Sequence, residues 1–259
     1  MRALEAGLDV ISGLHQLLGE DSEFAAAARL HNAVIVDVRR PPPPRLFSGD
    51  ANDVPARVAL LVGSDCAVGK MTAALELTRA ARERGVRARF IATGQTGIMI
   101  AGGGTAIDRT IADFASGAAE ELVFDGARDA DLLFVEGQGG INHPAFAPVT
   151  LALLYGTAPD ALILAHVATR SQIEDFRTPL LPLPRLVALY EKLCAGVKPA
   201  KVVGIALNTH GLDRTQASRG IDAARQATGL PCDDVVRAGP RALYDALAPA
   251  LASKTRALR

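Results

Sequence analysis

The sequence predicts an α/β fold in which a mostly parallel sheet carries helices on both faces. From Ala56 onward, short apolar runs rich in β-branched residues alternate with segments of helical periodicity, which is the pattern of successive βαβ units. The stretch LVGSDCAVGKMT, residues 61–72, joins the first of these strands to a helix and contains two glycines and a lysine. Such a stretch between a strand and a helix favours a phosphate-binding loop.

The N-terminal part is predicted to be a smaller unit. Residues 1–38 read as a helix, a second helix over 22–30 and a short strand over 33–38. A run of prolines at 41–44 then favours polyproline II, and the polar residues after it lack periodicity. The predicted domains are therefore an N-terminal segment at 1–38, a connector at 39–55 and the main domain at 56–259.

Five strands and five helices are predicted to alternate in the main domain. The strands are expected at 58–62, 86–92, 132–135, 161–166 and 201–207. The helices are expected at 70–84, 107–119, 184–195, 215–228 and 240–251. The glycine-rich stretch ATGQTGIMIAGGG, residues 92–104, is predicted to be a loop that a ligand approaches closely.

The glycine loop departs from the usual phosphate loop in two ways. Five residues separate Gly63 from Gly69 where four are usual, and Met71 stands where a Ser or Thr normally ligates Mg²⁺. A thioether is a poor ligand for that hard cation, so the loop is predicted to hold a phosphate rather than to split a triphosphate. The predicted cofactor-binding residues are Gly63, Ser64, Asp65, Cys66, Ala67, Val68, Gly69, Lys70, Met71, Thr72 and Asn208.

Longer stretches resemble known families. The extra loop residue, together with LLFVEGQGG, is similar to the dethiobiotin synthetase branch of phosphate-loop proteins. The stretches that carry a closer resemblance lie within residues 5–209 and are EAGLDVISGLH, SDCAVGKMT, ATGQTGIMIAGGG, VEGQGGINHPAF and GIALNT. Through them the chain more closely resembles a former domain of unknown function that is typified by D-glutamate N-acetyltransferase. This resemblance implies a phosphate-loop NTPase-like domain preceded by a short remnant of a Rossmann-like N-terminal domain.

The resemblance also implies an activity. It is the acetyl-CoA-dependent transfer of an acyl group to the amino group of a small amino acid, D-glutamate or similar, with the loop gripping the CoA phosphates. Transfer from a thioester needs no magnesium, which fits Met71. The resemblance further implies that family members usually carry a longer Rossmann-like stretch, so this chain is expected to begin near the end of that stretch. Two alternatives stay open: an ATP- and Mg-dependent kinase or ligase of the dethiobiotin synthetase type, and a non-catalytic nucleotide- or CoA-binding sensor.

Glu136 and His143 are the main catalytic candidates, and two further residues are alternatives. Glu136 ends a buried strand, where open parallel sheets place ligands, and it could accept the proton of a substrate ammonium group or organise magnesium through water. His143, in the next loop, has an ordinary pKa near 6.5 that suits a proton acceptor. His166, at the end of the strand ALILAH, competes for the same role. Cys66 leaves a ping-pong route open, since a helix N-terminus lowers the pKa of a thiol.

Other polar residues at the same edge are candidate substrate contacts. Gln95 can hydrogen-bond a substrate, and Asn208 matches a position that reads adenine in related phosphate-loop folds. Arg170 and Arg177 are candidates to clamp a carboxylate, and Asp108 is expected to favour a helix N-terminus. The predicted substrate-binding residues are Gln95, Thr96, Gly97, Gln138, His166, Arg170 and Arg177, and no metal ligand is predicted.

The composition excludes several classes of partner. Lys+Arg and Asp+Glu both total 28 among 259 residues, so no overall basic field attracts nucleic acid or an anionic membrane. The three cysteines lack the spacing of a disulfide framework or a zinc site, and no apolar run approaches the ~20 residues of a membrane helix. We expect a cytoplasmic homo-oligomer that acts on a small amino acid, without a nucleic-acid or membrane partner.

Overall fold

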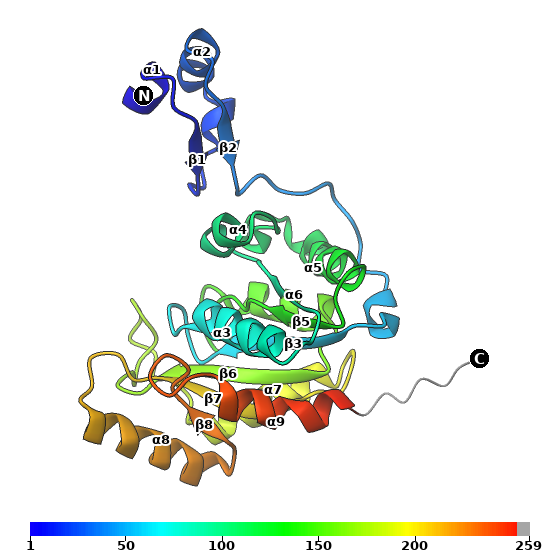
Figure 1. The fold of residues 1–259 in the computed structure, drawn as a ribbon, viewed down its shortest axis with the longest axis vertical. Helices are drawn as coiled ribbons and strands as arrows, with labels where there is room; N and C mark the ends of the chain where they lie inside the picture. Colours follow the sequence, from blue (N-terminus) through cyan, green and yellow to red (C-terminus); the bar gives the residue numbers. More distant parts are fainter. Residues whose placement is uncertain (253–259) are drawn as a thin grey trace.

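The main domain is built on a six-stranded parallel sheet (Figure 1). The computed structural model describes residues 1–252, and its sheet has the strand order β4-β5-β3-β6-β7-β8. All neighbouring pairs in this sheet run parallel. The strands are β3 (Arg57–Gly63), β4 (Ala88–Ile91), β5 (Leu132–Val135), β6 (Ala161–Val167), β7 (Lys201–Asn208) and β8 (Cys232–Asp233).

Helices cover both faces of the sheet, as predicted. One face packs against α3 (Lys70–Glu83), α4 (Gln95–Ala101) and α9 (Arg241–Ala252). The other packs against α5 (Ala112–Ala127), α6 (Ala147–Gly156), α7 (Leu183–Cys194) and α8 (Arg214–Thr228). The predicted fold class, a phosphate-loop α/β domain with a mostly parallel sheet, is therefore confirmed.

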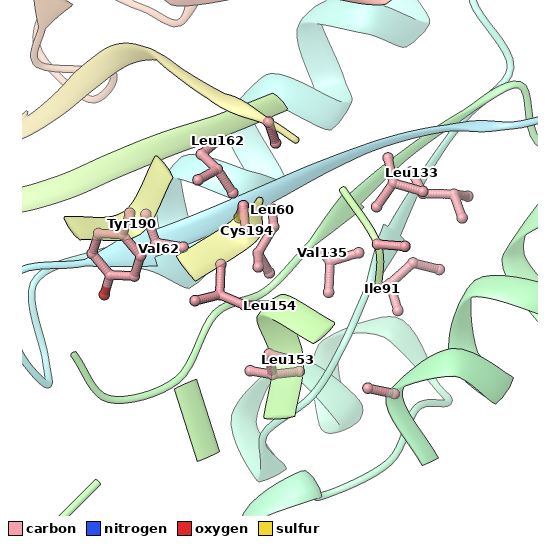
Figure 2. Packing of buried hydrophobic residues seen from close by; sticks show 14 of the residues in the cluster. Leu60, Val62, Ile91, Leu133, Val135, Leu153, Leu154, Leu162, Tyr190 and Cys194 are labelled. Carbon is pink, nitrogen blue, oxygen red and sulfur yellow. The ribbon is translucent and has the colours of Figure 1, made fainter. Parts of the chain in front are cut away.

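The core explains why the strands read as continuous apolar runs. Along β3, Leu60 and Val62 pack into the cluster under α5, α6 and α7, whereas Leu61 packs into the cluster under α3. Figure 2 shows the first cluster, in which Leu60 and Val62 meet side chains of neighbouring strands and of the covering helices. Since successive side chains point to opposite faces, a strand buried on both sides has no polar alternation.

A small N-terminal lobe precedes this domain. It contains α1 (Arg2–Glu5), β1 (Val10–Ser12), η1 (Leu18–Glu20), α2 (Ser22–Leu30) and β2 (Ile35–Asp37), and its two strands pair in parallel. The lobe lies at one end of the molecule, beyond α4 (Figure 1). A Cβ built on Gly13 would lie 3.0 Å from both the Gln95 and Met99 side chains, so β1 ends directly against α4.

Several element predictions were wrong, each for a local reason. The stretch 92–104 is not all loop, because α4 forms within it and ends at Gly102 with φ 74°. The helix predicted at 107–119 begins only at Ala112, after a short turn η3 (Ile107–Arg109), and runs on to Ala127. Helix α6 was not predicted, because its sequence APVTLALLYG is apolar on nearly every side and lacks the amphipathic periodicity that indicates a helix. Strand β1 occupies part of the N-terminus that was predicted to be helical.

The connector after β2 is mostly irregular and includes one short turn, η2 (Asp50–Asp53). Its Ala51 is fully buried, and the Glu120 carboxylate of α5 accepts hydrogen bonds from the Ser48 and Gly49 N–H groups. The connector is thus anchored along the main domain. Over residues 1–252, no helix combines the length and apolar character needed to cross a membrane.

Candidate functional site

The candidate site lies where the carboxyl ends of the central strands meet. The loop after β3 carries the glycine stretch, the loop after β4 leads into α4, and the loop after β5 begins with Glu136. Because β5 and β6 flank β3 on either side, these loops surround one crevice. Open parallel sheets bind ligands at such a point.

The glycine loop presents a row of unused backbone donors. Ala67 and Gly69 have φ of 50° and 100°, and the left-handed turn at Gly69 directly precedes α3. Within the described part of the chain, nothing accepts a hydrogen bond from the N–H groups of residues 67–72. Successive free N–H groups at a helix N-terminus form an anion-binding nest, so the loop is suited to a phosphate.

Lys70 lies folded into the loop. Its Nζ donates hydrogen bonds to the carbonyl oxygens of Asp65 at 2.7 Å and Gly139 at 2.8 Å. The side chain is buried, and the desolvation lowers the pKa of Lys70 to about 8. An incoming phosphate would offer this ammonium group a charged acceptor in place of two neutral ones.

Tight backbone packing joins this loop to the one after β5. The Tyr190 hydroxyl donates to the Gly63 carbonyl at 2.6 Å and accepts from the Ile141 N–H at 3.0 Å. A Cβ on Gly137 would lie 1.8 Å from the Leu61 carbonyl oxygen, so only glycine fits there. The two loops therefore keep a fixed spacing, which sequence reasoning did not detect because Tyr190 lies far along the chain.

Glu136 is held with one carboxylate oxygen fixed and the other unbound. Its Oε2 accepts hydrogen bonds from the Thr93 and Gly94 N–H groups at 3.0 Å and 3.2 Å. No described residue bonds to Oε1. Burial raises the pKa of Glu136 and outweighs the opposing effects of these N–H groups and of Lys70. A buried carboxylate with a raised pKa and a free oxygen can act as a general base.

Gly97 gives Glu136 its room. A Cβ at this position would lie 2.3 Å from Glu136 Oε2. We expect Gly97→Ala to push the carboxylate off its two N–H donors and to lower kcat about 10- to 50-fold for the reaction proposed below, because small misplacements of a general base are costly. Steady-state kinetics checks this. Gly103→Ala is the matched control, since a Cβ there meets nothing within 4 Å, and equal losses in both variants would contradict the interpretation.

The ring of His143 is enclosed by groups of its own loop and by its neighbours. Its Nδ1 accepts hydrogen bonds from the Ala145 and Phe146 N–H groups at 3.1 Å and 3.2 Å, which leaves the ring proton on Nε2, 3.8 Å from Asp65 Oδ1. The ring is buried against Phe146 and Phe176. With Nδ1 occupied and Nε2 protonated, the histidine has no free lone pair for a substrate proton. The structure instead uses His143 to hold the loop that leads into α6.

The same tautomer bears on a cluster of potential metal ligands. Asp65, Cys66 and His143 offer ligand atoms that lie within 4.8 Å of one another. A neutral histidine that binds a metal through Nε2 must carry its proton on Nδ1, and here Nδ1 accepts from two N–H groups. The cluster therefore does not suit a metal ion in this geometry.

Arg170 and Arg177 do not form the predicted carboxylate clamp. Nη1 of Arg170 donates to Asp65 Oδ2 at 3.1 Å and to the Cys66 carbonyl at 2.7 Å, and Nη2 pairs with Glu174. Asp65 is fully buried, so Arg170 serves to neutralise and fix it beneath the glycine loop. Arg177 is exposed at the surface. Neither side chain lines the hollows described below.

His166 and Cys66 are also poorly suited to the roles considered for them. The His166 Nδ1 lies 2.9 Å from the Ser64 hydroxyl, and burial, with the nearby Arg170, lowers the pKa of His166 to about 4. The imidazole is thus neutral and hydrogen-bonded within the loop wall. Burial raises the pKa of the Cys66 thiol despite the nearby Lys70. A thiol that holds its proton is a weak nucleophile, which argues against a ping-pong route.

Three hollows adjoin one another along this edge. A hollow of about 280 Å³, which we call the end pocket, lies between the glycine loop and the residues around β8. It shares Val68, Gly69, Thr72 and Asn208 with a groove of about 650 Å³ over the loop itself, the loop groove. The loop groove shares Cys66, Gln95, Gln138 and Gly139 with a cavity of about 840 Å³, the inner cavity.

The hollows bring together most of the residues predicted from sequence. The loop groove is lined by residues 66–72, by Glu136 and by Asn208. Thr96 of α4 also lines it, and Gln95 and Gln138 stand where it meets the inner cavity. Thr72 faces the end pocket and the loop groove, whereas Met71 also packs partly into the core cluster under α3.

Sequence reasoning missed the residues that close the inner cavity. His15 and Arg39 come from the N-terminal lobe and its connector, and Asp108 comes from η3. Asp108 was expected to favour a helix terminus, but its carboxylate pairs with Arg39 and lies 3.8 Å from His15 Nε2. No local pattern links these three residues, because only the docking of the lobe on the main domain brings them together.

The chain is similar to proteins of a family described as a domain of unknown function, DUF1611. Its P-loop domain matches residues 45–244, and its Rossmann-like N-terminal domain matches residues 1–41. A D-glutamate N-acetyltransferase of Pseudoalteromonas sp is 38% identical over 241 residues, which are 92% of this chain and 71% of that protein. A D-glutamate N-acetyltransferase of Tritonibacter scottomollicae is 40% identical over 252 residues, 96% of this chain and 74% of that protein.

A solved structure agrees with the fold. The crystal structure of a DUF1611 family protein from Anabaena variabilis has 41% sequence identity to this chain and a TM-score of 0.92. The similarity covers 96% of this chain and 73% of that one. It includes the N-terminal lobe as well as the main domain.

Proposed function

The chain belongs to the DUF1611 family, and on that premise we propose that it is an N-acetyltransferase that moves an acetyl group from acetyl-CoA to the amino group of D-glutamate or a similar amino acid. The family relationship supports an N-acetyltransferase. The identity of the acetyl donor and the role of the glycine loop rest on the geometry of the site.

The observation that carries this proposal is the row of three adjoining hollows. An acyl-CoA has a nucleotide end, a pyrophosphate and a long arm that ends in the thioester. The end pocket suits the nucleotide end, the loop groove with the free N–H groups of residues 67–72 suits the pyrophosphate and the arm, and the inner cavity opens beyond the end of the arm. In this arrangement the nucleotide occupies the end pocket beside Asn208, and the thioester reaches the border between groove and cavity.

The chemistry then falls to Glu136. The amino acid's ammonium group gives one proton to Glu136 Oε1, and the resulting amine attacks the thioester carbonyl carbon. The new C–N bond forms, the C–S bond breaks, and the CoA thiolate takes up the amine's second proton. Glu136 lines the loop groove, and Gln95 and Gln138 stand beside it at the border, where they can hydrogen-bond the carbonyl or the amine.

Calorimetry with acetyl-CoA and with ATP tests the proposal. We expect acetyl-CoA to bind with or without magnesium, and D-glutamate with acetyl-CoA to yield N-acetyl-D-glutamate and free thiol. Tight ATP binding that requires magnesium, with no response to acetyl-CoA, would contradict the proposal.

Met71 provides a separate test. We expect Met71→Thr to gain no magnesium-dependent ATPase and to keep acetyl transfer within about threefold of wild type, because no step of a thioester transfer needs a metal at this position. Phosphate release with ATP and magnesium is the measurement. Leu75→Thr controls for lost packing, since Leu75 is also partly buried against the cluster under α3. A new ATPase in Met71→Thr alone would favour a kinase or ligase.

A further inference from the structure

Arg39 is a buried cation at the wall of the inner cavity. Arg39 is 7% exposed, and it lines the cavity together with His15 and Asp108. The guanidinium Nε donates to the Gly13 carbonyl oxygen at 2.7 Å, and Nη1 donates to the Asp108 carboxylate. These two contacts, one to the N-terminal lobe and one to the main domain, therefore orient the guanidinium group.

The third nitrogen of this guanidinium has no assigned partner. Among the described residues, none accepts a hydrogen bond from Arg39 Nη2. The atom is also not sealed inside the protein, since the buried side-chain atoms without a partner are Thr110 Oγ1 and Asn142 Oδ1 over the same residues. Because Arg39 lines the inner cavity, a ligand in this cavity lies against the residue that carries the open donor.

The cavity wall offers a ligand few charged groups besides Arg39. Arg39 and His15 are the basic residues of the lining, Asp108 is the acidic one, and the remainder are polar or apolar. The Asp108 carboxylate is already engaged by Arg39. The exposed His15 imidazole lies near Asp108 as well. A planar guanidinium with unused N–H groups binds a carboxylate in preference to most other ligands.

We propose that Arg39 binds a carboxylate of the amino-acid acceptor, so that the N-terminal lobe and its connector complete the acceptor site of the main domain. This inference rests on the proposed function. The bound carboxylate lies at the far wall of the inner cavity, and the amino group points toward Gln95 and Gln138, where the cavity meets the loop groove and Glu136. Asp108 holds the guanidinium in place.

Arg39→Gln is the first test, with Arg40→Gln as its matched control. Arg40 is the next residue and pairs with Glu20 at the surface. We expect Arg39→Gln to raise the KM for D-glutamate about 10- to 100-fold, as the loss of a charge-assisted hydrogen bond predicts. The dissociation constant for acetyl-CoA should stay within about twofold in both variants, because Arg39 does not line the loop groove. Unchanged KM for D-glutamate in Arg39→Gln would overturn the inference.

Asp108→Asn separates carboxylate binding from a structural role. It removes the ion pair but keeps the guanidinium and its contact with Gly13. If Arg39 only joins the lobe to the main domain, both substitutions raise the KM for D-glutamate equally. If Arg39 binds the substrate, Asp108→Asn raises the KM less than Arg39→Gln does, because the guanidinium and its contact with Gly13 remain.

Amide analogues of the acceptor identify the contact. In D-glutamine a neutral amide replaces the side-chain carboxylate, and in D-isoglutamine a neutral amide replaces the α-carboxylate. We expect the penalty of Arg39→Gln to vanish for one of these two acceptors and to persist for the other. An equal penalty for D-glutamate and both amides would overturn the inference, since a folding defect does not distinguish them.

Direct binding of D-glutamate distinguishes failure of the inference from failure of the proposed function. Acetyl transfer by the wild type, with a KM insensitive to Arg39, would leave the function in place and overturn the site. Calorimetric binding of D-glutamate that disappears in Arg39→Gln, without any acetyl transfer, would support the site and overturn the function.

Discussion

Glu136→Gln is expected to lower kcat for acetyl transfer about 10²- to 10⁴-fold, the usual contribution of a positioned general base. Gln has the same shape and can still accept from the Thr93 and Gly94 N–H groups that hold Oε2. The substitution therefore removes the basic oxygen while it preserves the local structure. Steady-state kinetics with D-glutamate and acetyl-CoA measures the loss.

The pH dependence of the same variant identifies the group. Burial raises the pKa of Glu136, and the carboxylate must be ionised to accept a proton. The kcat of the wild type should therefore rise with pH through this raised pKa and level off above it, whereas Glu136→Gln should lack this acidic limb. Glu136→Asp should keep the limb with a lower plateau.

Two control measurements test this interpretation. Acetyl-CoA should bind Glu136→Gln within about threefold of wild type, because the loop N–H groups and Lys70 remain. Glu83→Gln, which neutralises an exposed carboxylate at the end of α3, should match the wild type in kcat. A full kcat in Glu136→Gln, or an acidic limb that survives in it, would mean that another group takes the proton.

The sequence predicted the parts of the site that depend on contiguous residues. The glycine loop and Glu136 each follow a buried strand, and parallel strands bring their carboxyl ends to one edge. Residues 66–72 and Glu136 accordingly line the same groove. Strand 132–135 was predicted with its observed bounds, because the four-residue apolar run LLFV lies directly between Asp131 and Glu136.

The remaining features depend on contacts between distant residues. Whether His143 is a base depends on which atoms meet its Nδ1, and the partners are N–H groups whose direction only the folded loop defines. Arg170 and Arg39 each pair with an aspartate, yet Arg39 also lines the inner cavity, whereas Arg170 lines none of the three hollows. Arg39 was predicted to lie in a connector because the sequence around it lacks periodicity. A sequence pattern does not show which surface a connector packs against.

Lys70→Met is the second large expected effect: it should weaken acetyl-CoA binding about 10²- to 10³-fold, since it removes charge-assisted hydrogen bonds to the phosphates. Methionine keeps the apolar stem of the side chain and its helix propensity. It also removes the donor to the Asp65 and Gly139 carbonyls. Thermal unfolding of the ligand-free variant measures the stability that is lost with these two hydrogen bonds.

The titration of Lys70 makes this prediction specific. In the ligand-free protein, desolvation lowers the pKa of Lys70 from its ordinary value of 10.5 to about 8. The unfolded chain therefore binds more protons than the folded chain between these values, and the contribution of Lys70 to the stability of the free protein rises with pH in that window. A bound phosphate restores the charged form, so acetyl-CoA binding near pH 9 should take up a proton.

Calorimetry in buffers of different ionisation enthalpy measures this uptake. The wild type should take up close to one proton near pH 9 and should lose affinity by up to about tenfold per pH unit above pH 8. Lys70→Met should show neither effect, and Lys192→Met, which alters an exposed lysine of α7, should show both. Proton uptake that persists in Lys70→Met would mean that the phosphates lie away from this lysine, and the glycine loop would then have to bind a different part of the ligand.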